Sequence, residues 1–398
     1  MVDQPPAAAA LPDEPAVPDE PLVSDEPLAS DEPDEPDDLG PAPRTSPRAL
    51  TLSIGMLLTA VLLTVLVALP APYAVSSPGP TRDVLGDVGG APLITINGAE
   101  TFDSSGELRL VTVSSTGGPG YPSSVSGVLR GWFDASTVVQ PVETVYPPEA
   151  SQEQINEENT AAMVSSQENA TVAALTELGY EVPATLAVAG TVEGTDAADK
   201  LVEGDVISAM DGTALTTYTQ LIEMLGAVSP GDTVTLTVQR DGEDVDVPIV
   251  TGTNADGGAQ IGVYIDPTFD LPVDVTIKID DIGGSSAGTM FALGIIDKLT
   301  PEDEADGAVI AGTGTMDVTG EVGPIGGIRQ KMAGALRDGA SWFLAPVSNC
   351  DEVVGHVPDG LRVVKIETLH DAREAITAIG AGTADDLPTC TAQDVAAG

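Results

Sequence analysis

The feature that most constrains this chain is an uncharged, largely apolar run at residues 49–69. A helix of this length spans roughly 30 Å, which is the thickness of the hydrocarbon core of a bilayer. Arg44 and Arg48 precede the run, and Arg82 is the nearest basic residue after it. The positive-inside rule therefore places the N-terminus in the cytoplasm. We predict a single-pass protein of the cell membrane, with most of the chain extracytoplasmic.

A cleaved signal peptide is the alternative interpretation of this run. Such a peptide has a shorter apolar region, followed by a cleavage site of the form A-x-A. In Ala71-Pro72-Tyr73-Ala74 the two alanines have the wrong spacing for such a site. The sequence therefore favours a retained anchor.

The segment before the apolar run, residues 1–48, repeats the tripeptide Asp-Glu-Pro. Its acidic side chains repel one another, and its prolines break helices and sheets. We predict a disordered cytoplasmic tail that serves as a solvated spacer, with partner binding as the alternative role.

The overall composition limits the size of the fold and the class of partner. The 398 residues give room for two or three folded domains. The formal net charge is −47, so a polyanion would be repelled, and we expect no nucleic-acid partner. Aromatic residues make up only 3% of the chain but hydrophobic residues 42%. Cores built from Val, Ile, Leu and Ala suit sheets covered by small helices.

Residues 70–182 follow the apolar run and change character along their length. Residues 70–92 are rich in Pro, Gly and Ser, which predicts a juxtamembrane linker, and short β segments follow at 93–96 and 108–113. Between residues 151 and 179 apolar residues recur at helical spacing, and acidic residues lie near the start. This pattern predicts one long amphipathic helix.

Residues 183–252 form a separate β-rich pattern with strands at 185–192, 205–209, 233–238 and 245–250 and a helix at 216–226. Leu201, Gly204 and Asp205 form a Leu-x-x-Gly-Asp-x-Ile stretch, which is followed by an Asp-Gly turn and a Pro-Gly-Asp turn. The order and spacing of these segments resemble a PDZ domain of bacterial type. The resemblance implies a groove that captures an extended peptide by strand addition. Any small barrel with tight turns is the structural alternative.

The most informative stretch for chemistry begins at residues 273–279, where apolar and polar residues alternate as in a half-buried strand. It leads into Gly283-Gly284-Ser285-Ser286-Ala287-Gly288, and an apolar helix follows. A serine at such a junction lies near unpaired backbone N–H groups, which predicts a nucleophile with an oxyanion hole around Ala287 and Gly288. The alternative is a helix N-cap.

A nucleophilic serine needs a base, and the chain offers few candidates. His356 and His370 lie near the C-terminus without an evident triad arrangement. Lys331 follows a glycine-rich turn and begins a helix with apolar residues, so its side chain is expected to be buried. Burial lowers a lysine pKa from about 10.4 toward roughly 7 to 8, where the neutral amine can accept a proton. A surface lysine on an ordinary helix is the alternative.

Taken in order, the serine junction, residues 311–314, the turn at 320–327 and Lys331 resemble the proteolytic domain of Lon proteases. The resemblance implies Ser286 as nucleophile, Lys331 as base and a hydrogen bond from Thr313 that holds the lysine. With the anchor and the PDZ-like segment, the chain resembles PDZ-containing Lon-like serine proteases of bacteria. It implies a membrane-anchored endopeptidase acting on unfolded or flexible extracytoplasmic proteins, with the PDZ domain capturing or gating substrate.

The expected fold class is an α/β (α+β) Lon-type domain joined to a small β-rich PDZ domain. The predicted order is an acidic tail (1–48), a transmembrane helix (49–69), a linker with β segments and a long helix (70–182), a PDZ domain (183–252), a Lon-like proteolytic domain (258–382) and a C-terminal tail (383–398).

Two departures from the family pattern affect the expected activity. Ser285 occupies the position where the family usually has proline, so either serine of the pair is a candidate, and Ser286 is preferred because Ala287-Gly288 follows it. The chain also lacks a G-x-x-x-x-G-K-[ST] phosphate loop, so hydrolysis is expected to be independent of ATP. No cofactor and no metal are expected, because no His or Cys cluster has ligand spacing.

Other functions remain open at this stage. The chain is alternatively an inactive membrane scaffold whose PDZ domain binds peptides, or a processing enzyme like signal peptidase, although the order of segments does not support the latter. The PDZ domain is alternatively a self-inhibitory lid. Resemblance to Lon also implies a homo-oligomer, with a hexameric ring as the expected form.

The two cysteines of the chain, Cys350 and Cys390, lie 40 positions apart. If this region is extracytoplasmic, the environment is oxidising, and we predict a disulfide between them. Two unrelated thiols are the alternative.

Overall fold

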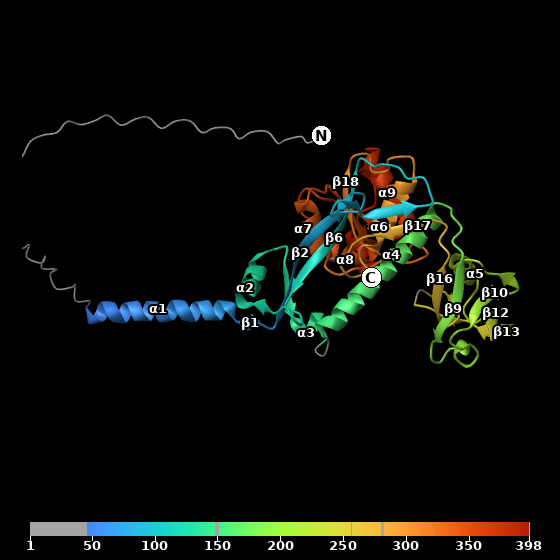
Figure 1. The fold of residues 1–398 in the computed structure, drawn as a ribbon, viewed down its shortest axis with the longest axis horizontal. Coiled ribbons are helices and arrows are strands. Elements are labelled where there is room, and N and C mark those ends of the chain that lie inside the picture. Colours follow the sequence, from blue (N-terminus) through green and yellow to red (C-terminus); the bar gives the residue numbers. More distant parts are fainter. Residues whose placement is uncertain (1–45, 148–150, 256, 280–281, 398) are drawn as a thin grey trace, which may run out of the picture. The chain divides into compact units, whose positions relative to one another are not determined.

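The computed structural model describes residues 46–147, 151–255, 257–279 and 282–397 (Figure 1). Residues 1–45 of the predicted acidic tail lie outside the described residues. Residue contacts divide the chain into two units, Met1–Ala60 and Val61–Gly398. Within the described residues, one helix is long and apolar enough to cross a membrane, namely α1 (Pro47–Ala68). Thr51 and Thr59 donate their hydroxyls to carbonyls one turn earlier, which satisfies these polar groups inside the helix.

A six-stranded mixed sheet forms the centre of the larger domain (Figure 1). Its spatial order is β22 (Arg362–Ile366), β21 (Trp342–Pro346), β18 (Val309–Gly312), β6 (Glu107–Thr116), β2 (Tyr73–Asp83) and β8 (Val138–Pro141). The first four strands are parallel, and β2 pairs antiparallel with both β6 and β8.

Helices cover both faces of this sheet, because its strands alternate apolar side chains between two cores. One core takes Leu344 of β21 and packs against α4 (Gln152–Glu177), α6 (Gly288–Leu299) and α9 (Leu369–Gly380). The other takes Phe343 and packs against α7 (Ile328–Arg337) and α8 (Cys350–Val353). The predicted long helix and the predicted α/β architecture are both present.

The linker prediction for residues 70–92 is wrong, because β2 lies inside the sheet. Its Pro and Gly residues occupy a break in the pairing with β6, between Pro78 and Thr81, where a missing N–H or side chain does no harm. A Cβ on Gly79 would lie 2.8 Å from the backbone of Thr112, so only glycine fits there. The folded core of the larger domain therefore begins near residue 73 and not at 258 as predicted.

Short elements complete this domain. They are β1 (Pro70–Ala71) with β7 (Ser123–Ser124), β3 (Asp87–Val88) with β4 (Ala91–Pro92), β5 (Ile94–Asn97) with β17 (Asp274–Ile277), β19 (Thr315–Met316) with β20 (Val322–Gly323), and the helices α2 (Val125–Phe133) and α3 (Val142–Val145). The pairing of β17 with β5 agrees with the half-buried strand predicted at 273–279.

The smaller domain has its own sheet, in the order β13 (Glu243–Val250), β12 (Thr233–Arg240), β10 (Val206–Met210), β9 (Ala184–Thr191) and β16 (Val263–Phe269). Helix α5 (Tyr218–Gly226) packs on it, and β11 (Thr213–Ala214), β14 (Gly252–Thr253) and β15 (Ala259–Gln260) form short hairpins. The predicted strands and helix are all present. The predicted boundary at 252 is too early, because β16 pairs with β9 along its length.

The C-terminal segment is folded onto the larger domain, whereas a tail was predicted from residue 383. Cys350 of α8 and Cys390 are joined by a disulfide, with 5.2 Å between their Cα atoms. Lys365 of β22 forms an ion pair with Asp394 of α10 (Ala392–Ala397). These contacts connect the last residues to the edge strand of the sheet.

Candidate active site

The Ser286 loop connects β17 to α6 and is held by the long helix α4. The N–H of Gly284 donates to the carbonyl of Asn159 at 2.9 Å, and the hydroxyl of Ser166 donates to the carbonyl of Ser285 at 3.0 Å. Both Asn159 and Ser166 belong to α4. The loop that carries the serine pair is therefore fixed by a helix far from it in the sequence.

Ser286 does not cap the helix that follows it. The N-cap residue of α6 is Ala287, and no side chain accepts a hydrogen bond there. The helix begins close against β19, since a Cβ on Gly288 would lie 2.9 Å from the backbone nitrogen of Met316. This close approach requires glycine at position 288. The hydroxyl of Ser286 is not used as a cap of α6.

Lys331 lies in the first turn of α7, and its side chain is buried, with 3% of the residue exposed. The helix begins at Gly327, whose φ of +70° is a left-handed conformation that favours glycine. Burial lowers the pKa of Lys331 from 10.5 to about 7, because desolvation penalises the ammonium form. A substantial fraction of this amine is therefore neutral near pH 7.

Thr313 directly follows β18 and connects the lysine with the serine loop. The Nζ of Lys331 donates to the Oγ1 of Thr313 at 3.0 Å, and that hydroxyl donates to the carbonyl of Ser286 at 2.9 Å. The N–H of Gly314 donates to the same carbonyl at 3.0 Å. Helices on opposite faces of the sheet thus bring their N-terminal ends together beyond the carboxyl end of β18.

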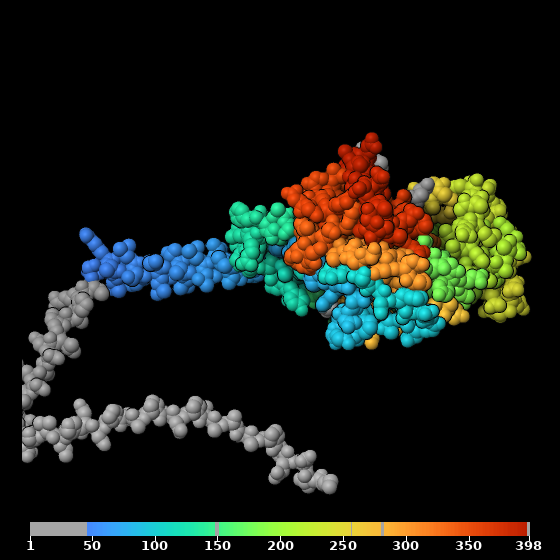
Figure 2. Space-filling view, turned by 90° about the horizontal axis from the view of Figure 1, so that it is seen from above, coloured from blue at the N-terminus to red at the C-terminus, as the bar shows by residue number. Residues whose placement is uncertain are grey.

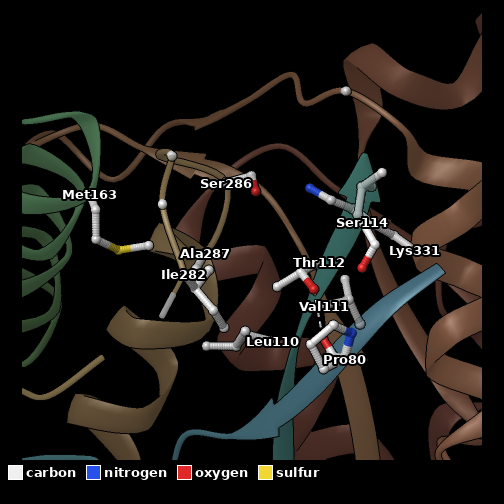
Figure 3. A pocket seen from close by; sticks show the side chains of 14 residues that line it. Pro80, Leu110, Val111, Thr112, Ser114, Met163, Ile282, Ser286, Ala287 and Lys331 are labelled. Carbon is white, nitrogen blue, oxygen red and sulfur yellow. Dashed lines mark hydrogen bonds between the residues drawn. The ribbon is translucent and has the colours of Figure 1, made fainter. Parts of the chain in front are cut away.

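Ser286, Ala287 and Lys331 line one pocket of about 430 Å³. Figure 3 shows the side chains of Ser286 and Lys331 pointing toward one another across it. Ser285, the other candidate serine, is not among the residues that line this pocket. The geometry therefore distinguishes between the two serines.

Several pocket residues were not found from the sequence. Thr112 and Ser114 come from β6, Met163 from α4 and Ile282 from the loop before the serine pair (Figure 3). Thr112 and Ser114 lie in a strand whose pairing with β18 no local pattern shows, and Met163 looked like an ordinary apolar position of the long helix. These residues could have been identified only if the sequence had shown that the 108–113 strand lies close to the Ser286 loop.

The amides at the start of α6 are the candidate oxyanion donors. The N–H of Gly288 already donates to the carbonyl of Ser285 at 3.4 Å, and that of Thr289 donates to Gly314 at 3.2 Å. Among the described hydrogen bonds, the amides of Ser286 and Ala287 have no acceptor. The amides of Ser286 and Ala287 are thus available to a ligand, whereas the amide of Gly288 already donates a long hydrogen bond to the carbonyl of Ser285.

The other candidate residues lie outside the pocket that Ser286 and Lys331 share. Leu201 is buried in the core of the smaller domain, and Gly204 has a φ of +91°. Asp205 is buried and binds Arg240 through two hydrogen bonds of 2.7 and 2.6 Å, which lower the pKa of its carboxyl. His370 pairs with Glu177, away from the pocket. Within the described ranges no group of three or more His, Cys, Asp or Glu side chains is placed to hold a metal ion.

Comparison with known families identifies both domains. Residues 271–378 match the Lon protease (S16) C-terminal proteolytic domain, which supports a serine peptidase of the Lon family. Residues 175–251 match the PDZ domain family. The combination supports a PDZ-containing Lon-like protease, as the sequence resemblance indicated.

Two Lon proteases agree with the first of these matches. The Lon protease of Helicobacter pylori is 31% identical over 143 residues, which is 34% of this chain but 17% of the relative. The archaeal Lon protease of Methanothermobacter thermautotrophicus is 30% identical over 110 residues, 27% of this chain and 16% of the relative. This chain thus spans about a sixth of the length of these relatives. A solved PDZ domain of the SdrC-like protein from Listeria monocytogenes has 25% identity and covers 20% of this chain and 85% of that structure, with a TM-score of 0.20.

Proposed function

We propose that this protein is a membrane-anchored serine endopeptidase that uses a Ser286–Lys331 dyad and no ATP. The observation that carries the proposal is the buried Lys331, whose pKa is lowered to about 7 and whose side chain shares a pocket with Ser286. A buried amine without an acidic partner is costly to the fold. Such a group is typical of a general base in an active site.

In the proposed mechanism, neutral Lys331 accepts the proton of the Ser286 hydroxyl as Oγ attacks the carbonyl carbon of a peptide bond. The amides of Ser286 and Ala287 stabilise the negative charge on the substrate oxygen. The ammonium of Lys331 then protonates the leaving amine, which yields an acyl-enzyme. Water attacks this ester with Lys331 again as base, and Ser286 is regenerated as the peptide acid leaves. Thr313 orients the lysine throughout.

The proposed substrates are unfolded or flexible proteins, because no ATP-driven unfolding module is recognisable in the sequence. The PDZ domain is proposed to capture an extended peptide. Its strand β16 ends the order of the sheet, so one edge of that strand has no strand partner among the described residues. An edge strand supports recognition by strand addition. Its effect on cleavage is either delivery of substrate or gating.

The proposed location is the cell membrane, with the N-terminus cytoplasmic and both domains extracytoplasmic. Helix α1 supports the anchor, and the Cys350–Cys390 disulfide is consistent with an oxidising compartment. By resemblance to Lon we also propose a homo-oligomer, a hexamer in the simplest case, which sedimentation velocity in detergent tests directly.

The first test is cleavage of casein without ATP by the parent chain and by Ser286→Ala, Lys331→Met and Ser285→Ala. Loss of cleavage by at least about 10³-fold is expected in the first two variants. Ser285→Ala is the matched control and should retain activity, since Ser285 does not line the pocket. Peptide binding by the PDZ domain with no serine-dependent cleavage would refute the enzyme and support the alternative, an inactive membrane scaffold.

A further inference from the structure

Helix α2 presents an exposed apolar face that the proposed catalysis does not use. Leu129, Trp132 and Phe133 are 43%, 60% and 90% exposed, and they lie at helical spacings of three and four, so they share one face. The opposite face, with Val128 and Gly131, is buried against the domain. Three large apolar side chains facing water on one short helix need a partner.

The structure places this helix directly at the end of the apolar span. The carbonyl of Leu69, the residue after α1, accepts a hydrogen bond of 3.0 Å from the amide of Val125, the first residue of α2. Next to it, β1 pairs with β7, which runs directly into α2. In Figure 2 the green segment that contains α2 lies at the surface of the larger domain. The interfacial layer of a bilayer is roughly 5 to 7 Å deep on each side, so the start of α2 lies within its reach.

The distribution of charge favours the same partner. In a chain with 62 acidic residues, residues 39–82 and 108–133 contain no Asp or Glu. These two segments pair with each other through β2 with β6 and β1 with β7. The only charge on α2 itself is Arg130, which is exposed. The part of the larger domain nearest the anchor thus avoids the charges that an anionic lipid surface would repel.

The chemistry of the exposed side chains fits a lipid interface better than a hydrocarbon core or bulk water. Trp and Tyr accumulate at the headgroup level, where an apolar ring and a polar N–H or O–H are both accommodated. Trp132 contacts Tyr73 edge to face at 6.1 Å between ring centroids, and Tyr121 nearby is 67% exposed. A short amphipathic helix with such a face lies in the plane of the interface.

We propose that α2 is a second membrane contact, which inserts Leu129, Trp132 and Phe133 into the headgroup layer of the leaflet that α1 enters. This inference rests on the membrane anchoring proposed above. A single flexible anchor would leave the protease domain free to rotate, whereas a second contact restricts its orientation to the membrane. The active-site pocket is then presented to substrates at a defined side.

The experiment uses the full chain in phosphatidylcholine vesicles whose acyl chains are brominated near the headgroup. The chain has two tryptophans, Trp132 and Trp342, so Trp342→Phe reports the first alone and Trp132→Phe the second alone. We expect brominated lipid to quench the Trp342→Phe protein and to leave the Trp132→Phe protein unchanged. Replacing Leu129 and Phe133 by serine in the Trp342→Phe background should reduce the quenching while casein cleavage persists, which shows that the fold is intact.

Flotation with ordinary vesicles is measured in parallel and separates the two proposals. A chain that floats but whose Trp132 is not quenched retains the anchor and overturns the lipid contact. Unquenched Trp132 with blue-shifted emission would indicate that a second copy of the chain covers α2. This result would also overturn the proposed lipid contact. A chain that does not float refutes the anchoring and this inference together.

Discussion

Replacing Lys331 by methionine should stabilise the larger domain near neutral pH while it abolishes cleavage. A pKa lowered from 10.5 to about 7 means that the unfolded chain binds the lysine proton more tightly than the folded protein does. At about 1.4 kcal/mol for each tenfold change in proton affinity, the folded state is destabilised by about 4 kcal/mol at pH 7. Loss of the hydrogen bond to Thr313 offsets about 1 kcal/mol, so the expected gain is about 3 kcal/mol.

The gain should depend on pH in a defined direction. Between pH 7 and 10.5 the unfolded state holds the proton and the folded state has lost it, so the stability of the parent rises with pH in this window. Lys331→Met has no such group, and its advantage should shrink as the pH approaches 10. The same deprotonation produces the proposed base, so casein cleavage by the parent should rise with pH through about 7.

The assay is urea unfolding of residues 70–398 in a Trp132→Phe background, followed by the fluorescence of Trp342 in β21. Because the PDZ domain contains no tryptophan, this signal reports the larger domain. Lys278→Met is the matched control, because Lys278 is exposed and directly follows β17. This variant should show no pH-dependent gain in stability. A Lys331→Met protein that is less stable than the parent at pH 7, or whose gain is the same at pH 7 and 10, would refute the reasoning.

Three further outcomes are expected. Arg240→Met should destabilise the PDZ domain by about 3 kcal/mol, because the buried carboxylate of Asp205 then lacks its positively charged partner. Thermal unfolding of the isolated domain measures this loss, and an unchanged midpoint temperature would contradict it. Ser166→Ala should slow casein cleavage about fivefold by removing an α4 hydrogen bond to the nucleophile loop, with an unaltered rate as the contrary result. Replacing Cys350 and Cys390 by serine should cost about 4 kcal/mol of stability, and equal urea midpoints with and without the disulfide would argue against that.

Much of the candidate site was accessible from local sequence. The strand at 273–279 and the helix after Gly288 follow from apolar periodicities of two and 3.6, which depend only on neighbouring residues. The Leu-x-x-Gly-Asp stretch likewise marks the PDZ domain, because Gly204 adopts a positive φ and Asp205 caps a local turn at Val202. These signals survive without knowledge of the rest of the fold.

Long-range strand pairing was not accessible in the same way. The Pro, Gly and Ser content of residues 70–92 predicted a linker, but β2 is stabilised by β6 and β8, and its prolines lie where the pairing with β6 is interrupted. Similarly, β16 joins the PDZ sheet through β9, which precedes it by more than seventy positions in the chain. Pairings of this kind depend on which faces become buried together, and composition does not show that.

The apolar run and the presence of two domains follow from the order of residues along the chain, because each rests on a pattern within a few turns or strands. The assignment of Ser286 and Lys331 came from the resemblance to Lon proteases, since the local patterns also allowed a helix cap and a surface lysine. The arrangement that makes the pair a candidate site exists only in the folded protein. Thr313 joins the lysine to the serine loop at the carboxyl end of β18, and α4 holds that loop from the side. Burial lowers the pKa of Lys331 to about 7, and burial is a property of the packed domain.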